Sequence, residues 1–182
     1  DFNHAFRLHY QPQFSLPERN MIGVEALLRW HDSELGSISP AEFIPVAEET
    51  GLILDVGKWV IENAFSYIAS WNDKHKKPIR MGINLSPLQF DSVDFFPFIQ
   101  DRIIHHGIDP KWIDFEITAN SAMNSSVLME EIFTALSSLG VQISIDDFGT
   151  GYSSLSYIKR FDVDQLKIAK ELIDHIAVHR EE

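Results

Sequence analysis

The chain has 182 residues, of which 45% are hydrophobic, and its formal net charge is −12. This length and apolar content are typical of a globular domain with a core of its own, and they exclude an intrinsically disordered chain. The acidic balance argues against a basic surface that binds a nucleic-acid polymer, and the absence of cysteine excludes disulfides, Cys-ligated zinc and thiol catalysis.

Two strands are expected first, at Leu8–Phe14 and Met21–Trp30. About six residues separate them, which is too few for a crossover helix, so we expect an antiparallel hairpin. Ser39 followed by Pro40 predicts the start of a helix. Apolar residues spaced four apart predict a second helix over about Val56–Trp71.

The second half of the chain alternates between strand and helix patterns. Further strands are expected at Ile79–Asn84, Ile113–Thr118, Val141–Asp146 and Gln165–Ile168. Helices are expected around Ile99–Ile104, ended by Gly107 and Pro110, and at Leu128–Leu139, with Gly140 as its C-cap. This alternation predicts a single α/β domain with a parallel sheet and right-handed crossovers.

Polar side chains stand at or near the carboxyl ends of the predicted strands. They are Glu25, Asn84, Glu116 with Thr118, the adjacent pair Asp146 and Asp147, and Lys167. Each alone has an ordinary explanation as a half-exposed strand residue or as a turn or helix cap. The carboxyl ends of parallel strands meet at one edge, however, and acids with an amide gathered there predict a hard-oxygen site for Mg²⁺ or Mn²⁺.

The adjacent carboxylates of Asp146 and Asp147 are the sharpest part of this pattern, because neighbouring negative charges at the end of a buried strand repel each other. One carboxylate could bind each of two metal ions, an arrangement suited to in-line attack on a phosphodiester. Lys167 would then orient the attacking water or stabilise charge on the phosphate.

Competing motifs are weak. The turn Gly149-Thr150-Gly151 lacks the remaining residues of a phosphate-binding loop and predicts a tight turn beside the metals. The adjacent pair His105-His106 lacks the spacing of a zinc-protease motif, and we interpret the histidines as surface or packing residues.

Longer motifs carry a resemblance to a known family. They are YQPQF at 10–14, GVEALLRW at 23–30, ISPAEFIPVAEETGLI at 38–53, NLSPLQF at 84–90, FEIT at 115–118, DDFGTGYSSLSYI at 146–158 and VDQLKI at 163–168. In these segments the chain resembles the EAL domain, the bacterial phosphodiesterase and receptor domain for cyclic di-GMP.

The resemblance implies a TIM-like (β/α)₈ barrel with an antiparallel first strand. It implies hydrolysis of cyclic di-GMP to linear pGpG with two Mg²⁺ or Mn²⁺ ions, and Ca²⁺ is expected to bind and inhibit. The implied ligands of the first metal are Glu25, Asn84, Glu116 and Asp146, and Asp146 with Asp147 bridges to the second.

Further roles come from the same resemblance. Glu25, Asp147 and Lys167 are the implied catalytic residues, with Lys167 near the nucleophilic water. Gln11, Leu27 and Arg29 are the implied ligand contacts, and Phe148, Gly149, Thr150 and Gly151 belong to a loop beside the second metal.

The chain departs from the family pattern at two positions. Ala119 stands where the family has a glutamate that tethers this loop, and Ala169 stands where it has an aspartate. The last two β/α units of the barrel are not recognised before Glu182, so we expect residues 1–182 to be one incomplete EAL domain from a larger signalling protein.

Three functions stay open: a weak cyclic di-GMP phosphodiesterase, a receptor that binds cyclic di-GMP without efficient turnover, and a relic that binds only proteins. The resemblance also implies a homodimer and an upstream GGDEF, PAS or receiver domain. No apolar run reaches the roughly 18 residues of a membrane span. We expect a cytoplasmic location, either free or as the cytoplasmic domain of a membrane-anchored protein.

Overall fold

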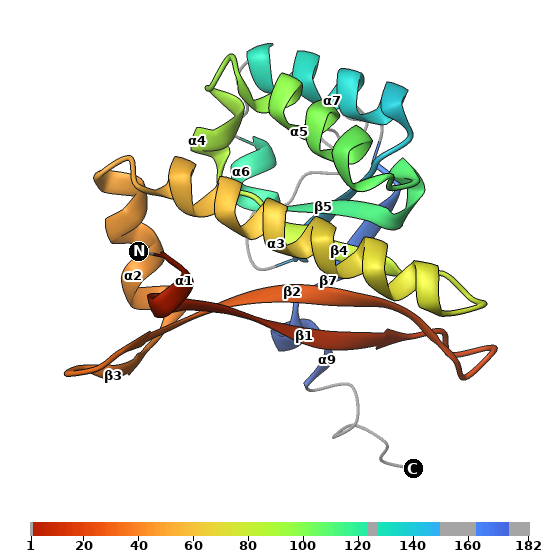
Figure 1. Cartoon of the computed structure of the whole chain (residues 1–182), viewed down its shortest axis with the longest axis horizontal. Coiled ribbons are helices and arrows are strands. Elements are labelled where there is room, and N and C mark those ends of the chain that lie inside the picture. Colours follow the sequence, from red (N-terminus) through yellow and green to blue (C-terminus); the bar gives the residue numbers. More distant parts are fainter. Residues whose placement is uncertain (1, 124–126, 150–162, 175–182) are drawn as a thin grey trace.

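The computed structural model describes residues 2–123, 127–149 and 163–174. Within them, seven strands form one sheet in the order β1-β2-β4-β5-β6-β7, and β3 pairs with β2 (Figure 1). The strands are β1 Phe6–Phe14, β2 Met21–Asp32, β3 Gly36–Ile38, β4 Arg80–Asn84, β5 Ile113–Thr118, β6 Gln142–Phe148 and β7 Gln165–Ile168. The six predicted strands are therefore confirmed, with shifts of a few residues at their ends.

The pairing directions also follow the prediction. β1 pairs antiparallel with β2, and β2, β4, β5, β6 and β7 pair parallel in succession. β3 was not predicted, because it is only three residues long and begins at Gly36, whose φ is +74°. β6 also continues to Phe148 rather than ending at Asp146, so the adjacent carboxylates belong to the strand itself.

The helices are α1 Phe2–Ala5, α2 Pro40–Glu49, α3 Ile53–Lys74, α4 Pro87–Phe90, α5 Phe95–His106, α6 Ala119–Met123, α7 Val127–Leu139 and α9 Lys170–Ile173, with a 3₁₀ turn at Pro110–Trp112. α2 begins after Ser39, as predicted, and α5 ends at Gly107, whose φ of +63° only glycine adopts readily. The predicted helix signals are thus confirmed.

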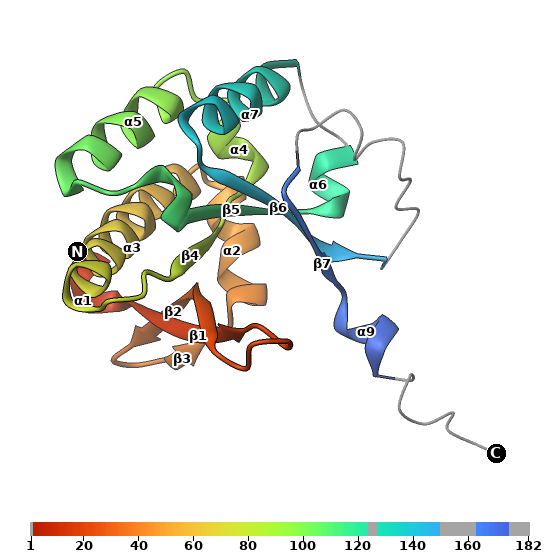
Figure 2. The same cartoon turned by 90° about the vertical axis from the view of Figure 1, so that its right-hand side faces the viewer.

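The three long helices α3, α5 and α7 lie on one side of the curved sheet (Figure 2). α3 presents Ile61, Phe65 and Ile68 to the sheet, and all three are fully buried. Each such side chain contributes on the order of 1.5–3 kcal/mol when it leaves water. This helical layer fixes the strands from outside and leaves their carboxyl ends accessible.

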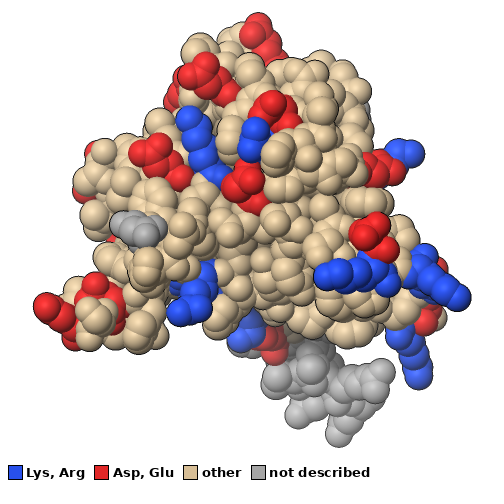
Figure 3. All heavy atoms as spheres, in the orientation of Figure 1, with Lys and Arg blue, Asp and Glu red and all other residues tan. Residues whose placement is uncertain are grey.

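Charged residues are spread over the surface. On the face in Figure 3, acidic side chains lie among basic ones, which is typical of a solvated surface rather than of a single basic patch. In the described part of the chain, none of the helices has the length and apolar character needed to cross a membrane.

Candidate active site

The predicted polar residues meet at the carboxyl ends of neighbouring strands. In the parallel register Asn84 of β4 lies beside Glu116 of β5, and Thr118 of β5 lies beside Asp146 of β6. Glu25 of β2 lies beside β4 at Gly82, one residue pair earlier. Parallel pairing alone therefore gathers these side chains, as the sequence predicted.

Lys167 of β7 joins three of the acids. Its Nζ donates to Glu25 Oε2 at 2.8 Å, to Glu116 Oε2 at 2.5 Å and to Asp146 Oδ2 at 3.2 Å. Burial lowers the pKa of Lys167, but the hydrogen bonds to Glu116 and Glu25 outweigh it and raise that pKa above its ordinary value. Lys167 is therefore a fixed cation among carboxylates.

Glu116 is the most buried member of the site, with no exposed surface. Among the described residues its Oε1 has no hydrogen-bond partner. Burial raises the pKa of Glu116 to about 8, against the lowering effect of the hydrogen bond from Lys167. A buried carboxylate oxygen without a partner is costly, and a bound cation would satisfy it.

Hydrogen bonds also hold Glu25 and Asp146 in place. Asn84 Nδ2 donates to Glu25 Oε1 at 2.8 Å, which leaves the Asn84 carbonyl oxygen available as a ligand. The backbone N–H of Asp147 donates to Asp146 Oδ1 at 2.8 Å, and Asp147 has a φ of +53°. Asp147 is exposed overall, but partial desolvation of its carboxyl group, together with the charge of Asp146, raises its pKa.

These residues fit a divalent cation. Glu25, Glu116 and Asp146 each place a carboxylate oxygen within 4.8 Å of those of the other two. Among the described residues, one ammonium contacts three carboxylates, so the cluster keeps an excess of negative charge. Carboxylate and amide oxygens are the ligands that Mg²⁺ and Mn²⁺ prefer. Among the described residues, Glu116 Oε1 has no hydrogen-bond partner and is available as such a ligand.

A cavity of about 460 Å³ adjoins this cluster. Leu27, Arg29, Asn84, Glu116 and Thr118 are among its lining residues. Two of the three predicted ligand contacts, Leu27 and Arg29, therefore lie in the cavity wall, next to two of the predicted metal ligands.

The third predicted contact lies on the neighbouring strand. Gln11 of β1 is paired with Glu25 and is exposed, but it is not among the residues that line this cavity. Arg29 Nη1 donates to the Leu28 carbonyl at 2.8 Å, which fixes one side of its guanidinium.

Sequence reasoning missed the polar floor of the cavity. Ser86 Oγ donates to Glu48 Oε1 at 2.6 Å, and the Ser86 N–H donates to Gln89 Oε1 at 2.9 Å. Gln89 is buried against Gly57, where a Cβ would collide with it. The available signal was the S-P-x-Q pattern of a capping box at residues 86–89, which positions Ser86 at the start of α4.

The two departures from the family pattern are both buried. Ala119 begins α6, and Ala169 donates its N–H to the carbonyl of Phe148 at 3.1 Å. Phe148 is half-buried, and Gly149 has a φ of +105°. The predicted loop residues Thr150 and Gly151 lie outside the described residues.

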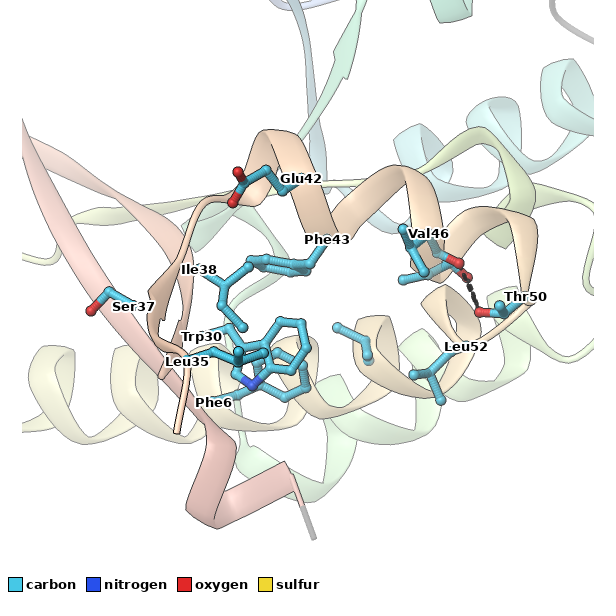
Figure 4. A pocket seen from close by; sticks show the side chains of 12 residues that line it. Phe6, Trp30, Leu35, Ser37, Ile38, Glu42, Phe43, Val46, Thr50 and Leu52 are labelled. Atoms are coloured by element: carbon cyan, nitrogen blue, oxygen red, sulfur yellow. Dashed lines mark hydrogen bonds between the residues drawn. The ribbon is translucent and has the colours of Figure 1, made fainter. Parts of the chain in front are cut away.

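A second cavity, of about 560 Å³, lies between the β3 hairpin and α2 (Figure 4). Its walls are mainly apolar and include Phe6, Trp30, Ile38 and Phe43. It shares none of its lining residues with the acidic cluster, and Glu42 is the one charged residue among those that line it.

Comparison with known proteins gives a consistent picture. The family model described as EAL domain matches residues 2–182. The signaling protein YkoW of Bacillus subtilis is 44% identical over 177 residues, which are 97% of this chain and 22% of YkoW. MucR of Pseudomonas aeruginosa, named a bifunctional diguanylate cyclase/cyclic di-GMP phosphodiesterase, is 42% identical over 93% of this chain and 25% of its own length.

The solved structure described as PaMucR phosphodiesterase in a c-di-GMP complex superposes with a TM-score of 0.89 at 40% identity. The match covers 96% of this chain and 71% of that one. The chain thus spans about a quarter of the length of the curated relatives that it matches.

Proposed function

Because the chain belongs to the EAL domain family, we propose that it binds cyclic di-GMP and hydrolyses one phosphodiester bond to give linear pGpG. The name of the MucR relative and the ligand in the solved complex support this substrate. The observation that carries the proposal is the cluster of Glu25, Glu116 and Asp146 around Lys167, beside a cavity lined by Leu27 and Arg29.

Two Mg²⁺ or Mn²⁺ ions, when bound, supply a water of lowered pKa and neutralise charge on the phosphate. Glu25, Asn84, Glu116 and Asp146 would hold the first ion, and Asp146 with Asp147 would hold the second. Ca²⁺ would occupy the same oxygens and inhibit, because it prefers longer bonds and looser geometry.

The chain's own residues do the remaining work. Arg29, fixed by its bond to the Leu28 carbonyl, presents its remaining N–H groups to a phosphate or a guanine. In hydrolysis a bond forms between water oxygen and phosphorus, and the bond from phosphorus to the ribose 3′ oxygen breaks. Lys167, cationic and held by Glu25 and Glu116, stabilises the negative charge that develops on the phosphoryl oxygens.

We propose that turnover is weak. Ala119 and Ala169 carry methyl groups where the family has acids, so neither side chain can accept a hydrogen bond from the loop that follows β6. The second candidate function, a receptor that binds cyclic di-GMP without efficient turnover, is favoured by the same two alanines together with the cavity lined by Leu27 and Arg29. The homodimer, the upstream GGDEF, PAS or receiver domain and the cytoplasmic location stay predictions.

The test is formation of pGpG from cyclic di-GMP with Mn²⁺, followed by chromatography, for the wild type, Glu116→Gln and the control Glu34→Gln. Glu34 is exposed, so its substitution leaves the site intact. Slow turnover that Glu116→Gln abolishes and Glu34→Gln retains supports the phosphodiesterase. Binding of cyclic di-GMP without formation of pGpG favours the receptor. If the chain neither binds cyclic di-GMP nor forms pGpG, the proposal is contradicted.

A further inference from the structure

A second cluster of metal-ligating side chains lies on the outer helical layer, on elements that contribute nothing to the acidic cluster. Glu62 comes from α3, and His105 and His106 come from the last turn of α5. One ligand atom of each lies within 4.8 Å of those of the other two. We propose that these three residues form a binding site for Zn²⁺ or a similar first-row transition metal.

The geometry is close to that of such a site. In a tetrahedral site, bonds of about 2.0–2.2 Å place ligand atoms about 3.3–3.6 Å apart. His106 Nε2 already lies 3.0 Å from Glu62 Oε1. His105 is exposed, and its ring packs edge-to-face on that of His106 with centroids 4.9 Å apart, so rotation of the His105 side chain alone would bring in the third ligand.

Neighbouring charges hold the carboxylate in place. Arg102 Nη1 contacts Glu62 Oε2 at 3.3 Å, which leaves Oε1 directed at the histidines. Arg102 is itself neutralised by Asp101, whose Oδ2 accepts from its Nε at 2.9 Å. Lys58, one turn before Glu62 on α3, lies over the ring of Phe98 instead. Asp101 therefore offsets the charge of Arg102 beside Glu62, and the ammonium of Lys58 lies over Phe98 rather than at the cluster.

The donor set separates this site from the acidic cluster. Two imidazole nitrogens and one carboxylate oxygen suit Zn²⁺, whereas the all-oxygen cluster around Lys167 suits Mg²⁺ or Mn²⁺. A metal bound here would link α3, which precedes β4 in the chain, to α5, which follows it. These two helices pack against each other. Because folding brings the three ligands together, the metal would bind the folded chain more tightly than the unfolded chain and raise the unfolding temperature.

The experiment titrates the chain with Zn²⁺ against a chromophoric chelator and follows the unfolding temperature. Because the acidic cluster can also take Zn²⁺, both measurements are made in the wild type and in Glu25→Gln/Asp146→Asn. We expect His105→Ala and Glu62→Gln to weaken one Zn²⁺ site at least tenfold and to remove its thermal shift in both backgrounds. Co²⁺ should give a visible spectrum of imidazole coordination that His105→Ala loses.

The matched control is His31→Ala, which removes another exposed histidine. It should leave the Zn²⁺ affinity unchanged. His105→Ala removes an exposed ring and should fold normally, which its unfolding temperature without metal verifies. Zn²⁺ binding that is unchanged in His105→Ala, or lost equally in His31→Ala, overturns the proposal. Neither result bears on hydrolysis of cyclic di-GMP, which is measured with Mn²⁺.

Discussion

The carboxylate of Glu116 occupies the space that a Cβ at position 82 would need. Gly82 lies on β4 between Glu25 and the next strand, so its missing side chain is what lets Glu116 turn inward. The two residues act as one unit, in which a glycine creates the space and a buried acid fills it.

Substituting Gly82 by alanine should displace this carboxylate. The added methyl group cannot coexist with Glu116 Oε1, so we expect Gly82→Ala to weaken Mn²⁺ binding at least tenfold. Overpacking of this kind costs about 1–3 kcal/mol of folding free energy. Calorimetric titration with Mn²⁺ and thermal unfolding measure the two effects.

The control for this variant is Ile83→Val, which trims a buried side chain on the same strand and costs about 0.5–1.5 kcal/mol. It should bind Mn²⁺ as the wild type does. Equal metal affinity in Gly82→Ala and wild type would show that Glu116 is not a ligand.

Removing the ammonium of Lys167 should expose the repulsion among the acids. Lys167→Met leaves Glu25, Glu116 and Asp146 facing one another, and breaking a buried pair of this kind costs about 3 kcal/mol. We expect the unfolding temperature of metal-free Lys167→Met to be lower than that of the wild type. Adding Mg²⁺ should raise the unfolding temperature of the variant by more than it raises that of the wild type.

Lys170→Met is the matched control, because Lys170 is exposed and its Nζ lies 3.8 Å from Asp174. Its metal-free unfolding temperature should change little. If both lysine variants behave alike, the ammonium of Lys167 has no special role in balancing the acids.

Metal affinity should rise with pH. In the metal-free chain, burial raises the pKa of Glu116 to about 8, so this carboxyl holds its proton below that pH. Metal binding needs the carboxylate, so a proton competes with it and affinity should rise by up to about tenfold per pH unit from 6 to 8 and then level off.

Calorimetry in two buffers of different ionisation enthalpy measures the proton released. Release of close to one proton at pH 7 and little above pH 9 is the expected result. A pH-independent affinity with no proton release contradicts the assignment of Glu116 as a ligand.

Restoring the family acids should raise turnover. One charge-assisted hydrogen bond contributes about 1.5 kcal/mol, which corresponds to about tenfold in rate. We therefore expect Ala119→Glu/Ala169→Asp to form pGpG about tenfold faster than the wild type with Mn²⁺. Both positions are buried, so the folding of the variant is verified first by thermal unfolding. Unchanged turnover in a folded variant would show that the two alanines do not limit activity.

Local sequence patterns predicted most of the helices and strands of this molecule. Features that depend on contacts between distant residues were not predicted. The apolar repeat of α3 and the alternating strands were readable because burial repeats with the period of each element. The convergence of Asn84 and Glu116 followed from parallel pairing alone. The pairing of β3 was not predictable, since three residues carry no period.

The hydrogen bonds within the site could not be predicted from the sequence. Lys167 reaches Glu25 across 142 positions, and the bond from Ser86 to Glu48 joins two different helix ends. Neither contact has a local pattern that identifies its partner. Residue types at strand ends predicted which chemistry to expect, whereas the hydrogen bonds that hold it depend on how distant segments pack.

The most direct measurement is calorimetric titration of the chain with cyclic di-GMP in the presence and absence of Ca²⁺, repeated with Asp146→Asn. Ca²⁺ takes the place of the active metal, so binding is measured without turnover. The account predicts that the wild type binds cyclic di-GMP and that Ca²⁺ raises its affinity. In Asp146→Asn, the affinity for cyclic di-GMP should no longer depend on Ca²⁺. Absence of binding under both conditions, or identical binding by wild type and variant, contradicts a metal-assisted cyclic di-GMP site at this cluster.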